Sequence, residues 1–418
     1  MKIMWLCNTL IESVAADINF GAQKPESWIT ATYNGIRSRD NFSLFYLFPF
    51  KQNGNLEFKR GNFYFASYVQ KNDFSYEKKQ EKRFETLIKI FHPDVIHIFG
   101  TECPHTLAML KVCCRLGIED RVVVSIQGLV SKCLGTACLP TKAILRFTFR
   151  DFLRLDNVYL RIRKLKKRGK YEKRSIELSK NIVGRTDWDY ACTNEINNNS
   201  TYYCCNETLR NSFYMSKWSL NTCETNSIFV SQSNYHIKGF HLMLEAMPSI
   251  LKEYPNAHLY TTGIDPLKMS FKQKIRQSYY NRYLGHLIKR FHLRNKVTFL
   301  GYLNEKEMCD RLLQSHVFVS CSSIENSPNS LGEAMLLGVP SVASDVGGVN
   351  SMMSHGIEGF LYPADEPYMI SHYIKRIFAN PSIANTLSAN SRKRAEITHN
   401  QDKNLKRIIE IYELVSRG

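Results

Sequence analysis

The sequence predicts an α/β fold of two domains, each built on a parallel sheet covered by helices. Its 418 residues exceed the roughly 100–200 residues of an ordinary domain, so two hydrophobic cores are expected. Short apolar runs with β-branched residues also alternate with helical patterns, which is typical of doubly wound parallel sheets. These runs lie at residues 94–99, 122–126, 227–231, 258–262, 296–300, 317–321 and 340–344.

A polar segment separates the two halves of the chain. Residues 194–226 are rich in Asn, Tyr and Thr, which favours a connection between domains. We therefore predict an N-terminal domain over residues 1–220 and a C-terminal domain over residues 221–395. The last segment, 396–418, spaces its apolar side chains at helical intervals, and this helix is a candidate to cross back to the N-terminal domain.

The composition indicates a folded protein without a membrane anchor. Hydrophobic residues make up 44% of the chain and charged residues 22%. The apolar run at the start is too short for a signal peptide, and no stretch approaches the ~20 apolar residues that span a bilayer. Twelve cysteines without a Cys-x-x-Cys pair indicate neither a zinc site nor a disulfide framework. A cytoplasmic location is expected.

The chain is strongly basic, with a formal net charge of +18, which favours contact with polyanions. The densest basic run covers residues 161–174 and is interrupted by Ile162, Leu165 and Tyr171. Basic amphipathic segments of this kind form either a solvated helix face or a patch that lies on anionic lipid, and both interpretations stay open. Nucleic-acid binding ranks third, because no nucleic-acid module is recognisable.

Two loops that follow predicted strands carry candidate functional residues, since ligands of open α/β sheets bind beyond the carboxyl ends of the strands. The first loop follows residues 317–321, contains Glu325, and opens into a helix that contains Glu333. A helix N-terminus binds anions, so the backbone amides of residues 329–331 are candidate phosphate donors. Without a ligand, Ser330 and Glu333 also fit a capping box, and Glu325 fits a solvated loop carboxylate.

The second loop, residues 231–239, follows the strand at 227–231 and contains Lys238. A charge-assisted contact from a lysine to a diphosphate contributes ~1.5–3 kcal/mol, and more in a dry cleft. The alternative is a solvated lysine that precedes a helix.

Residues 325–348 resemble the donor-binding signature of glycosyltransferase family 4, also called group 1. The resemblance rests on the spacing of Glu325 and Glu333, on Gly-x-Pro at 338–340 and on Asp-Val-Gly-Gly at 345–348. It implies a GT-B architecture, in which two Rossmann-like domains face each other across a cleft. It also implies similarity to bacterial capsular and exopolysaccharide glycosyltransferases.

The resemblance assigns roles to residues of both loops. It implies that Glu325 contacts sugar hydroxyls and that Glu333 holds the ribose hydroxyls of the donor. It implies that Lys238 and the amides of residues 329–331 bind the diphosphate. Gln232 stands where the family usually has an arginine, and phosphate neutralisation is expected to be weaker there.

In the N-terminal half, Gln127 stands in the loop where the family usually has a histidine, and it can donate a hydrogen bond but cannot titrate. Arg185 is the best cation that this half could lend to the cleft, and a salt bridge to Asp187 or Asp189 is the alternative. Gly21 loosely matches the family's glycine-containing loop after the first strand. The predicted catalytic residues are Glu325, Lys238, Gln127 and Arg185, and the predicted donor contacts are Gln232, Lys238, Tyr302, Glu325, Asn329, Ser330, Leu331, Glu333 and Gly21.

The family resemblance implies a retaining, metal-independent hexosyltransferase with no cofactor besides its nucleotide-diphosphate sugar, for which a UDP-sugar is favoured. The expected acceptor is a saccharide, lipid-linked, in cell-surface polysaccharide biosynthesis, which would place the protein peripherally on the cytoplasmic face of the membrane. No nucleic-acid partner is expected. Two alternatives stay open: a sugar-nucleotide epimerase of similar architecture, which the missing histidine and Gln232 favour, and a non-catalytic polyanion-binding protein, which only the net charge favours.

Overall fold

The computed structural model describes residues 1–20, 29–51, 55–70, 74–133 and 139–417. Within it the chain forms two compact units. The first unit comprises Met1–Cys133, Lys164–Arg210 and His399–Gly418, and the second comprises Leu134–Arg163 and Asn211–Thr398. The predicted α/β fold with two mainly parallel sheets is confirmed. The predicted functional division after residue 220 stays a prediction.

The described part of the first unit contains an eight-stranded sheet in the order β3-β4-β2-β1-β5-β6-β7-β8. β3 pairs antiparallel with β4, whereas the other pairs are parallel. β1, β5 and β6 are buried along almost their whole length, which is why they read as continuous apolar runs in the sequence. The strands are β1 (Lys2–Leu6), β2 (Ser43–Phe50), β3 (Glu57–Arg60), β4 (Phe63–Val69), β5 (Val95–Phe99), β6 (Val122–Ser125), β7 (Asn181–Gly184) and β8 (Thr201–Cys204).

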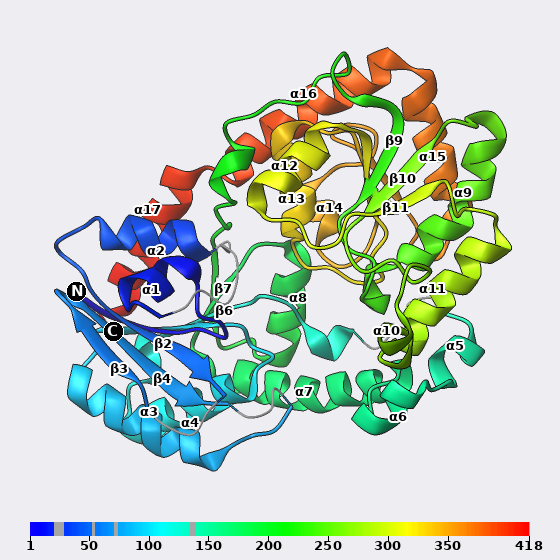
Figure 1. The fold of residues 1–418 in the computed structure, drawn as a ribbon. Helices are drawn as coiled ribbons and strands as arrows, with labels where there is room; N and C mark the ends of the chain where they lie inside the picture. The colour runs from blue at the N-terminus through cyan, green and yellow to red at the C-terminus, as the bar shows by residue number, and fades with distance from the viewer. Residues whose placement is uncertain (21–28, 52–54, 71–73, 134–138, 418) are drawn as a thin grey trace. The chain divides into compact units, whose positions relative to one another are not determined.

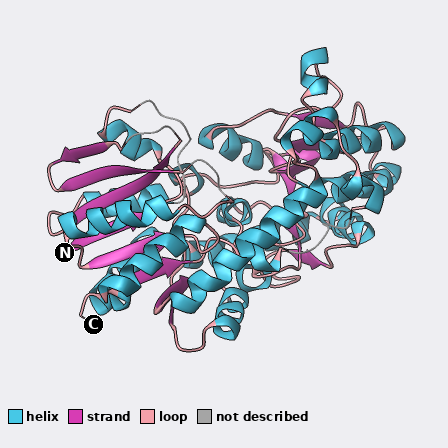
Figure 2. Ribbon diagram, turned by 90° about the horizontal axis from the view of Figure 1, so that it is seen from below, coloured by secondary structure: helices cyan, strands magenta, loops and turns pink. Residues whose placement is uncertain are grey.

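Helices cover both faces of this sheet (Figures 1 and 2). α2 (Ile29–Arg37) and α17 (Gln401–Val415) contribute to one apolar core, and α3 (Lys78–Phe91) and α4 (Pro104–Leu116) contribute to the other. The C-terminal helix α17 therefore packs within the first unit. There the hydroxyl of Tyr412 accepts a hydrogen bond from Trp5 Nε1 at 3.1 Å and lies 2.6 Å from His97 Nδ1. Also in this unit are α1 (Glu12–Asp17) and α8 (Asp187–Ile196).

The second unit contains a parallel sheet whose described strands are ordered β11-β10-β9-β12-β13-β14. The strand order reverses between β9 and β12, so the loops that follow these two strands open side by side at the carboxyl edge. The strands are β9 (Glu224–Val230), β10 (His258–Thr261), β11 (Val297–Phe299), β12 (Ser315–Ser320), β13 (Ser341–Ser344) and β14 (Phe360–Tyr362).

Helices also surround this second sheet. The larger ones are α9 (Phe240–Glu253), α11 (Tyr279–Arg290), α12 (Glu305–Leu313), α13 (Asn329–Leu337), α15 (Pro367–Ala379) and α16 (Pro381–Thr398), and the short ones are α5 (Thr141–Leu145), α6 (Phe149–Arg154), α10 (Phe271–Ile275) and α14 (Val349–Met352). Among the helices that the structure describes, none is both long and apolar enough to cross a bilayer.

The basic run lies on α7 (Val158–Leu178), which begins in the second unit and continues in the first. Of the apolar residues that interrupt the basic run, Ile162 and Leu165 are buried and therefore not available to lipid. Several of its cations, including Lys166, Lys167 and Lys170, are exposed. The apolar side of this amphipathic helix therefore packs against the protein, and its basic side faces solvent.

Candidate active site

The two loops predicted from the sequence lie against each other in the second unit. β9 and β12 are paired in register, with Ile228 opposite Val317, so both loops leave the sheet at the same level. The Ser323 N–H then donates to the Ile237 carbonyl at 2.8 Å. The Cys321 thiol lies 3.3 Å from the Lys238 carbonyl. These contacts fix the loop after β9 to the loop after β12.

Two glycines allow close approaches to the loop after β12, Gly239 from the loop after β9 and Gly347 from the loop after β13. Gly239 has φ +68°, and a Cβ atom there would lie 1.7 Å from the Cys321 carbonyl oxygen. Gly347 has φ +55°, and a Cβ atom there would lie 2.0 Å from the Glu325 carbonyl oxygen. A side chain at either position would combine left-handed backbone with a clash against main chain. The backbone of the loops after β9 and β13 therefore depends on these glycines.

Lys238 and Glu325 meet where the loops join. Lys238 Nζ lies 2.5 Å from Glu325 Oε1, and the Ser322 hydroxyl donates to the same oxygen at 2.7 Å. The Glu325 side chain is 12% exposed, so the interpretation of Glu325 as a solvated loop carboxylate is wrong. An ammonium group has three N–H donors, so Lys238 can hold this carboxylate and still contact an anion. The pair thus places a cation beside a hydroxyl-binding acceptor.

The helix N-terminus beside this pair differs from one expectation. Pro328, which has no side-chain acceptor, occupies the N-cap of α13, so the alternative of a capping box between Ser330 and Glu333 is wrong. The Leu331 N–H donates to the Pro328 carbonyl at 3.0 Å. Of the three predicted amides, those of Asn329 and Ser330 are therefore the better phosphate donors. Glu333 lies on the buried side of the helix and is 4% exposed.

The other predicted donor-binding residues do not contact Lys238 or Glu325 through hydrogen bonds among the described residues. Gln232 is exposed in the loop after β9, and Tyr302, which follows β11, is 80% exposed. Within the described residues, no hydrogen bond joins either of them to Lys238 or Glu325. Gly21 lies outside the described residues.

In the first unit, Gln127 and Arg185 converge on Glu207. Gln127 Nε2 donates to Glu207 Oε1 at 3.2 Å, and the Arg185 guanidinium forms an ion pair with the same carboxylate. Arg185 also donates to the Ile126 carbonyl at 2.8 Å, and its side chain is only 5% exposed. The side-chain salt bridge expected as the alternative was to Asp187 or Asp189. The structure instead pairs Arg185 with Glu207, while Asp189 accepts from the Arg185 backbone N–H at 3.1 Å.

These three residues line a small cavity of about 40 Å³ at the carboxyl ends of β5, β6 and β7. His97 and Ser125 line the same cavity, with His97 Nε2 2.6 Å from the Ser125 hydroxyl. Burial lowers the pKa of His97 to about 3, so the imidazole is neutral at physiological pH. The sequence analysis missed Glu207 because this residue lies in the polar segment interpreted as a connection between domains. In such a segment the sequence does not distinguish a buried, paired carboxylate from a solvated one.

The second unit also holds a buried histidine in the loop that carries Lys238. His236 packs edge-on against the rings of Tyr235 and Tyr280. Burial, together with the charge of Arg161, lowers the pKa of His236 to about 4. Among the described residues, no cluster of three or more His, Cys, Asp or Glu side chains could hold a metal ion.

Known proteins resemble this chain in sequence and in fold. Residues 212–394 match the family described as glycosyl transferases group 1. This part of the chain, which carries both donor loops, is similar to group 1 glycosyltransferases. An uncharacterized glycosyltransferase of Methanocaldococcus jannaschii is 27% identical over 188 residues, which are 45% of this chain and 44% of that protein. The matches to three curated relatives each span less than half of those proteins' lengths.

Solved structures show that the whole chain has a GT-B fold. Sucrose-phosphate synthase from Thermosynechococcus elongatus superposes with a TM-score of 0.70 at 16% identity, covering 99% of both chains. Anabaena HepE in complex with UDP-glucose superposes with a TM-score of 0.66 at 14% identity, also covering 99% of both. At these identities the similarity establishes the architecture only.

Proposed function

We propose that this protein transfers a sugar from a nucleotide-diphosphate sugar to a saccharide acceptor. The observation that carries the proposal is the meeting of Lys238 and Glu325 at the carboxyl ends of two adjacent strands, beside the N-terminus of α13. A cation and free helix amides suit a diphosphate, and a partly buried carboxylate suits sugar hydroxyls. The match of residues 212–394 to group 1 glycosyltransferases supports the same activity.

In this proposal each residue has a separate task. Lys238 and the amides of Asn329 and Ser330 stabilise the charge that builds on the departing diphosphate. Glu325 orients the sugar through its hydroxyls. Glu333, whose side chain is buried on α13, holds the ribose.

We propose that transfer retains the anomeric configuration. The glycosidic bond to the diphosphate breaks while the acceptor oxygen bonds to the anomeric carbon on the same face. The leaving diphosphate takes the proton of the acceptor hydroxyl. The protein positions both substrates and stabilises the leaving charge without supplying a nucleophile. Lys238 and the helix amides supply positive charge at this point, so we propose a metal-independent reaction of the family 4 type.

The donor and acceptor are also part of the proposal. A UDP-sugar is favoured, and the likeness of this fold to a protein solved with UDP-glucose supports it. For the acceptor we propose a lipid-linked saccharide of cell-surface polysaccharide assembly, of the capsular or exopolysaccharide kind. This acceptor would bring the enzyme to the cytoplasmic face of the membrane.

A thermal-shift screen across UDP-, GDP- and dTDP-sugars tests the donor directly. We expect one nucleotide to raise the melting temperature and its sugar to be transferred when acceptor is added. Product analysis without acceptor then separates a transferase from an epimerase, because only an epimerase would convert the donor sugar under those conditions. Absence of any shift across the panel would contradict the proposal and favour a protein that only binds polyanions.

A further inference from the structure

The second unit exposes a run of large apolar side chains on and around α6. Phe149, Phe152 and Leu153 are 65%, 67% and 65% exposed, and Leu155 is 60% exposed. Phe147, just before the helix, is 46% exposed. Single exposed apolar residues are ordinary, but a contiguous group of this size indicates an interaction surface.

The orientation of α6 fixes these side chains outward. Phe149, Phe152 and Leu153 are spaced i, i+3 and i+4, so they share one face of the helix. The opposite face is anchored by Asp151, which is fully buried and accepts from the Tyr279 N–H at 2.7 Å. Thr148, at the N-cap, donates to the Gln277 carbonyl at 2.8 Å. Because of these anchors, α6 cannot turn its phenylalanines inward without breaking buried hydrogen bonds.

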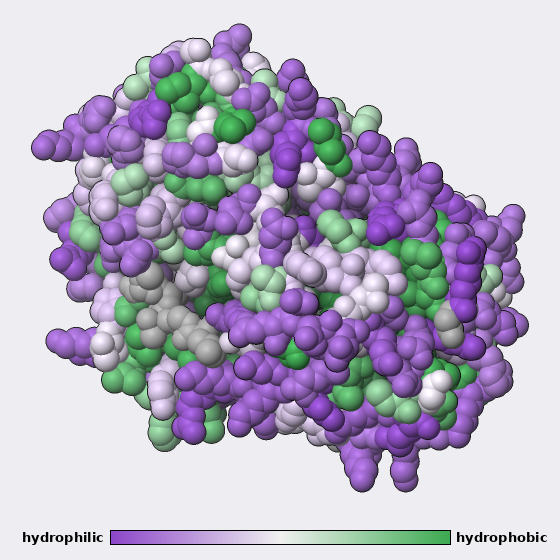
Figure 3. Space-filling view, turned by 180° about the vertical axis from the view of Figure 1, so that it is seen from behind, coloured by the Kyte–Doolittle hydropathy of each residue, from purple (hydrophilic) through white to green (hydrophobic). Residues whose placement is uncertain are grey.

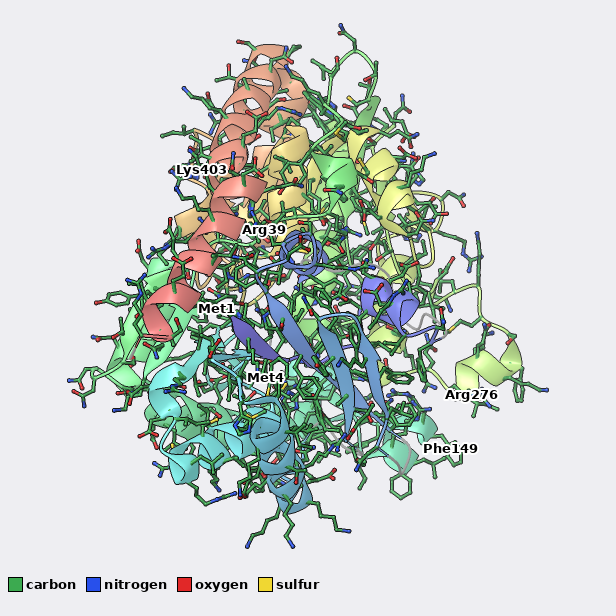
Figure 4. The ribbon with its side chains drawn as sticks, turned by 90° about the vertical axis from the view of Figure 1, so that its left-hand side faces the viewer. Met1, Met4, Arg39, Phe149, Arg276 and Lys403 are labelled. Atoms are coloured by element: carbon green, nitrogen blue, oxygen red, sulfur yellow. The ribbon has the colours of Figure 1, made fainter. Side chains whose placement is uncertain are left out.

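The same anchors bring α10 beside α6. Gln277 lies two residues after α10 (Phe271–Ile275), and Tyr279 begins α11. Phe271 of α10 is 78% exposed. Ile275, four residues later on the same helix face, is also exposed. Figure 4 labels Phe149 of α6 and Arg276, which directly follows α10. On the face that Figure 3 shows, hydrophobic residues lie among hydrophilic ones. We call α5, α6 and α10, with their connecting residues 146–148 and 155, the apolar ridge.

Basic side chains accompany the apolar ones on the ridge and directly after α10. They are Lys142, Arg146, Arg154, Lys272, Lys274 and Arg276, all exposed. Among the salt bridges of the described residues, none involves these six. The acidic residues nearby, Asp151 and Asp156, are engaged with Arg150 and Arg161. The ridge therefore combines protruding apolar groups with unneutralised positive charge.

We propose that the apolar ridge docks on an anionic lipid bilayer. Its phenylalanines and leucines would enter the boundary between headgroups and acyl chains, and its lysines and arginines would contact lipid phosphates. A bilayer suits the ridge better than a protein partner, because lysine is depleted at protein interfaces whereas basic amphipathic helices are typical of membrane surfaces. The inference rests on the proposed function only in that a lipid-linked acceptor would explain why docking is useful.

The ridge is connected to the donor loops within the same unit. Arg161, in the first turns of α7, donates to Asp156 at 2.8 Å, and Asp156 directly follows the ridge residue Leu155. The charge of Arg161 also acts on His236 and Tyr235, which lie in the loop that carries Lys238. The ridge and the loop that carries Lys238 thus belong to the same unit.

Vesicle flotation tests the proposal with the full-length protein. We expect wild type to float with phosphatidylcholine vesicles containing phosphatidylglycerol at low salt, and flotation to fall at high salt. The variant Phe149→Ser/Phe152→Ser/Leu153→Ser should reduce bound protein by about tenfold or more. The matched control Met215→Ser/Tyr368→Ser/Ile397→Ser changes three exposed apolar residues of the same unit outside the ridge, and it should float like wild type.

A second pair of variants separates the ridge from α7. Lys142→Gln/Arg146→Gln/Arg154→Gln should weaken flotation, whereas Lys166→Gln/Lys167→Gln/Lys170→Gln, on exposed positions of α7, should not. The proposal is overturned if ridge variants float like wild type, if the controls lose binding equally, or if wild type ignores anionic vesicles and instead self-associates through the ridge. The donor-induced thermal shift of each variant is measured in parallel. If wild type floats but no nucleotide sugar raises its melting temperature, the proposed function is contradicted while the proposal for the ridge stands.

Discussion

The two units hold their candidate residues in different ways. In the second unit the backbone positions the site, because Gly239, after β9, and Gly347, after β13, let their loops pack against carbonyl groups of the loop after β12. In the first unit side chains position one another, since Gln127 and Arg185 both bind Glu207. A site positioned by backbone contacts can be recognised in the sequence by its glycines and fixed spacings. A site positioned by side-chain contacts appears in the sequence only as isolated polar residues. The difference also predicts how each site breaks.

The largest effect is expected from Gly239→Ala. Its Cβ would lie 1.7 Å from the Cys321 carbonyl oxygen, so the loop that carries Lys238 must move away from β12. We expect transfer to fall by about 10²-fold or more, because a misplacement of about 1 Å is enough for a loss of that size. Steady-state kinetics with the donor selected by the thermal-shift screen measures this loss.

Gly356→Ala is the matched control for that variant. Gly356 also has a positive φ, of +76°, but a Cβ there meets no atom within 4 Å. It should cost only ~1–2 kcal/mol of stability from the left-handed backbone and leave kinetics near wild type. Equal losses of transfer in the two variants would show that backbone strain, not the contact between loops, is responsible.

Removing the charged groups of the second unit should be nearly as damaging to transfer. Lys238→Ala, Glu325→Ala and Glu333→Ala are each expected to lower transfer by about 10²–10³-fold, as for loss of a group that stabilises developing charge. The melting temperatures should change little for the first two, whose side chains are partly exposed. Near-normal kcat for Lys238→Ala would refute the diphosphate role of that residue.

In the first unit, breaking the ion pair should cost stability. Arg185→Met leaves Glu207 buried without its cation, and we expect a loss of about 3 kcal/mol in the free energy of unfolding. Arg174→Met breaks the exposed pair with Glu177 and should cost less than about 1 kcal/mol. Chemical denaturation compares the two. Similar losses would mean that the Arg185–Glu207 ion pair contributes no more stability than an exposed ion pair.

The free energy of unfolding should fall at mildly acidic pH, because each unit buries a neutral histidine. Burial lowers the pKa of His97 to about 3 and that of His236 to about 4 from an ordinary 6.5. At a pH between the lowered pKa of the folded protein and 6.5, these histidines bind protons in the unfolded chain but not in the folded one. The free energy of unfolding therefore falls as the pH falls below 6.5. His97 alone should cost ~2 kcal/mol at pH 5.

Urea unfolding at pH 7.5, 6.5, 5.5 and 5 checks this dependence. His97→Gln should flatten the slope, and His372→Gln, at an exposed position, should not. Stability that stays constant or rises on acidification would contradict the role given to burial.

The smallest effect is expected from a chelator. Lys238 and the first amides of α13 supply the positive charge at the proposed leaving group, so EDTA should leave transfer unchanged within about twofold. The measurement is the transfer rate before and after dialysis against EDTA. A loss that Mg²⁺ or Mn²⁺ restores would mean that a metal shares the task of Lys238.

The sequence predicted the second sheet and its two loops because strands buried on both faces and glycine-dependent turns leave strong local patterns. It did not predict Glu207, whose role depends on residues about 20 and 80 positions away that only the fold brings near. It also missed the ridge, because Phe149 and Phe152 are indistinguishable from core residues until Asp151 is seen to anchor the opposite face. The predicted capping box does not form because the N-cap of α13 is Pro328, two positions before Ser330.

Calorimetric titration with the nucleoside diphosphate selected by the thermal-shift screen tests the central claim, that the donor is bound by the two loops of the second unit. Wild type, Lys238→Ala and Gln127→Ala are compared. We expect Lys238→Ala to weaken the Kd by ~10–100-fold, the loss of one charge-assisted contact, and Gln127→Ala to change it by less than about threefold. An unchanged Kd for Lys238→Ala, or an equal loss in Gln127→Ala, would contradict the account.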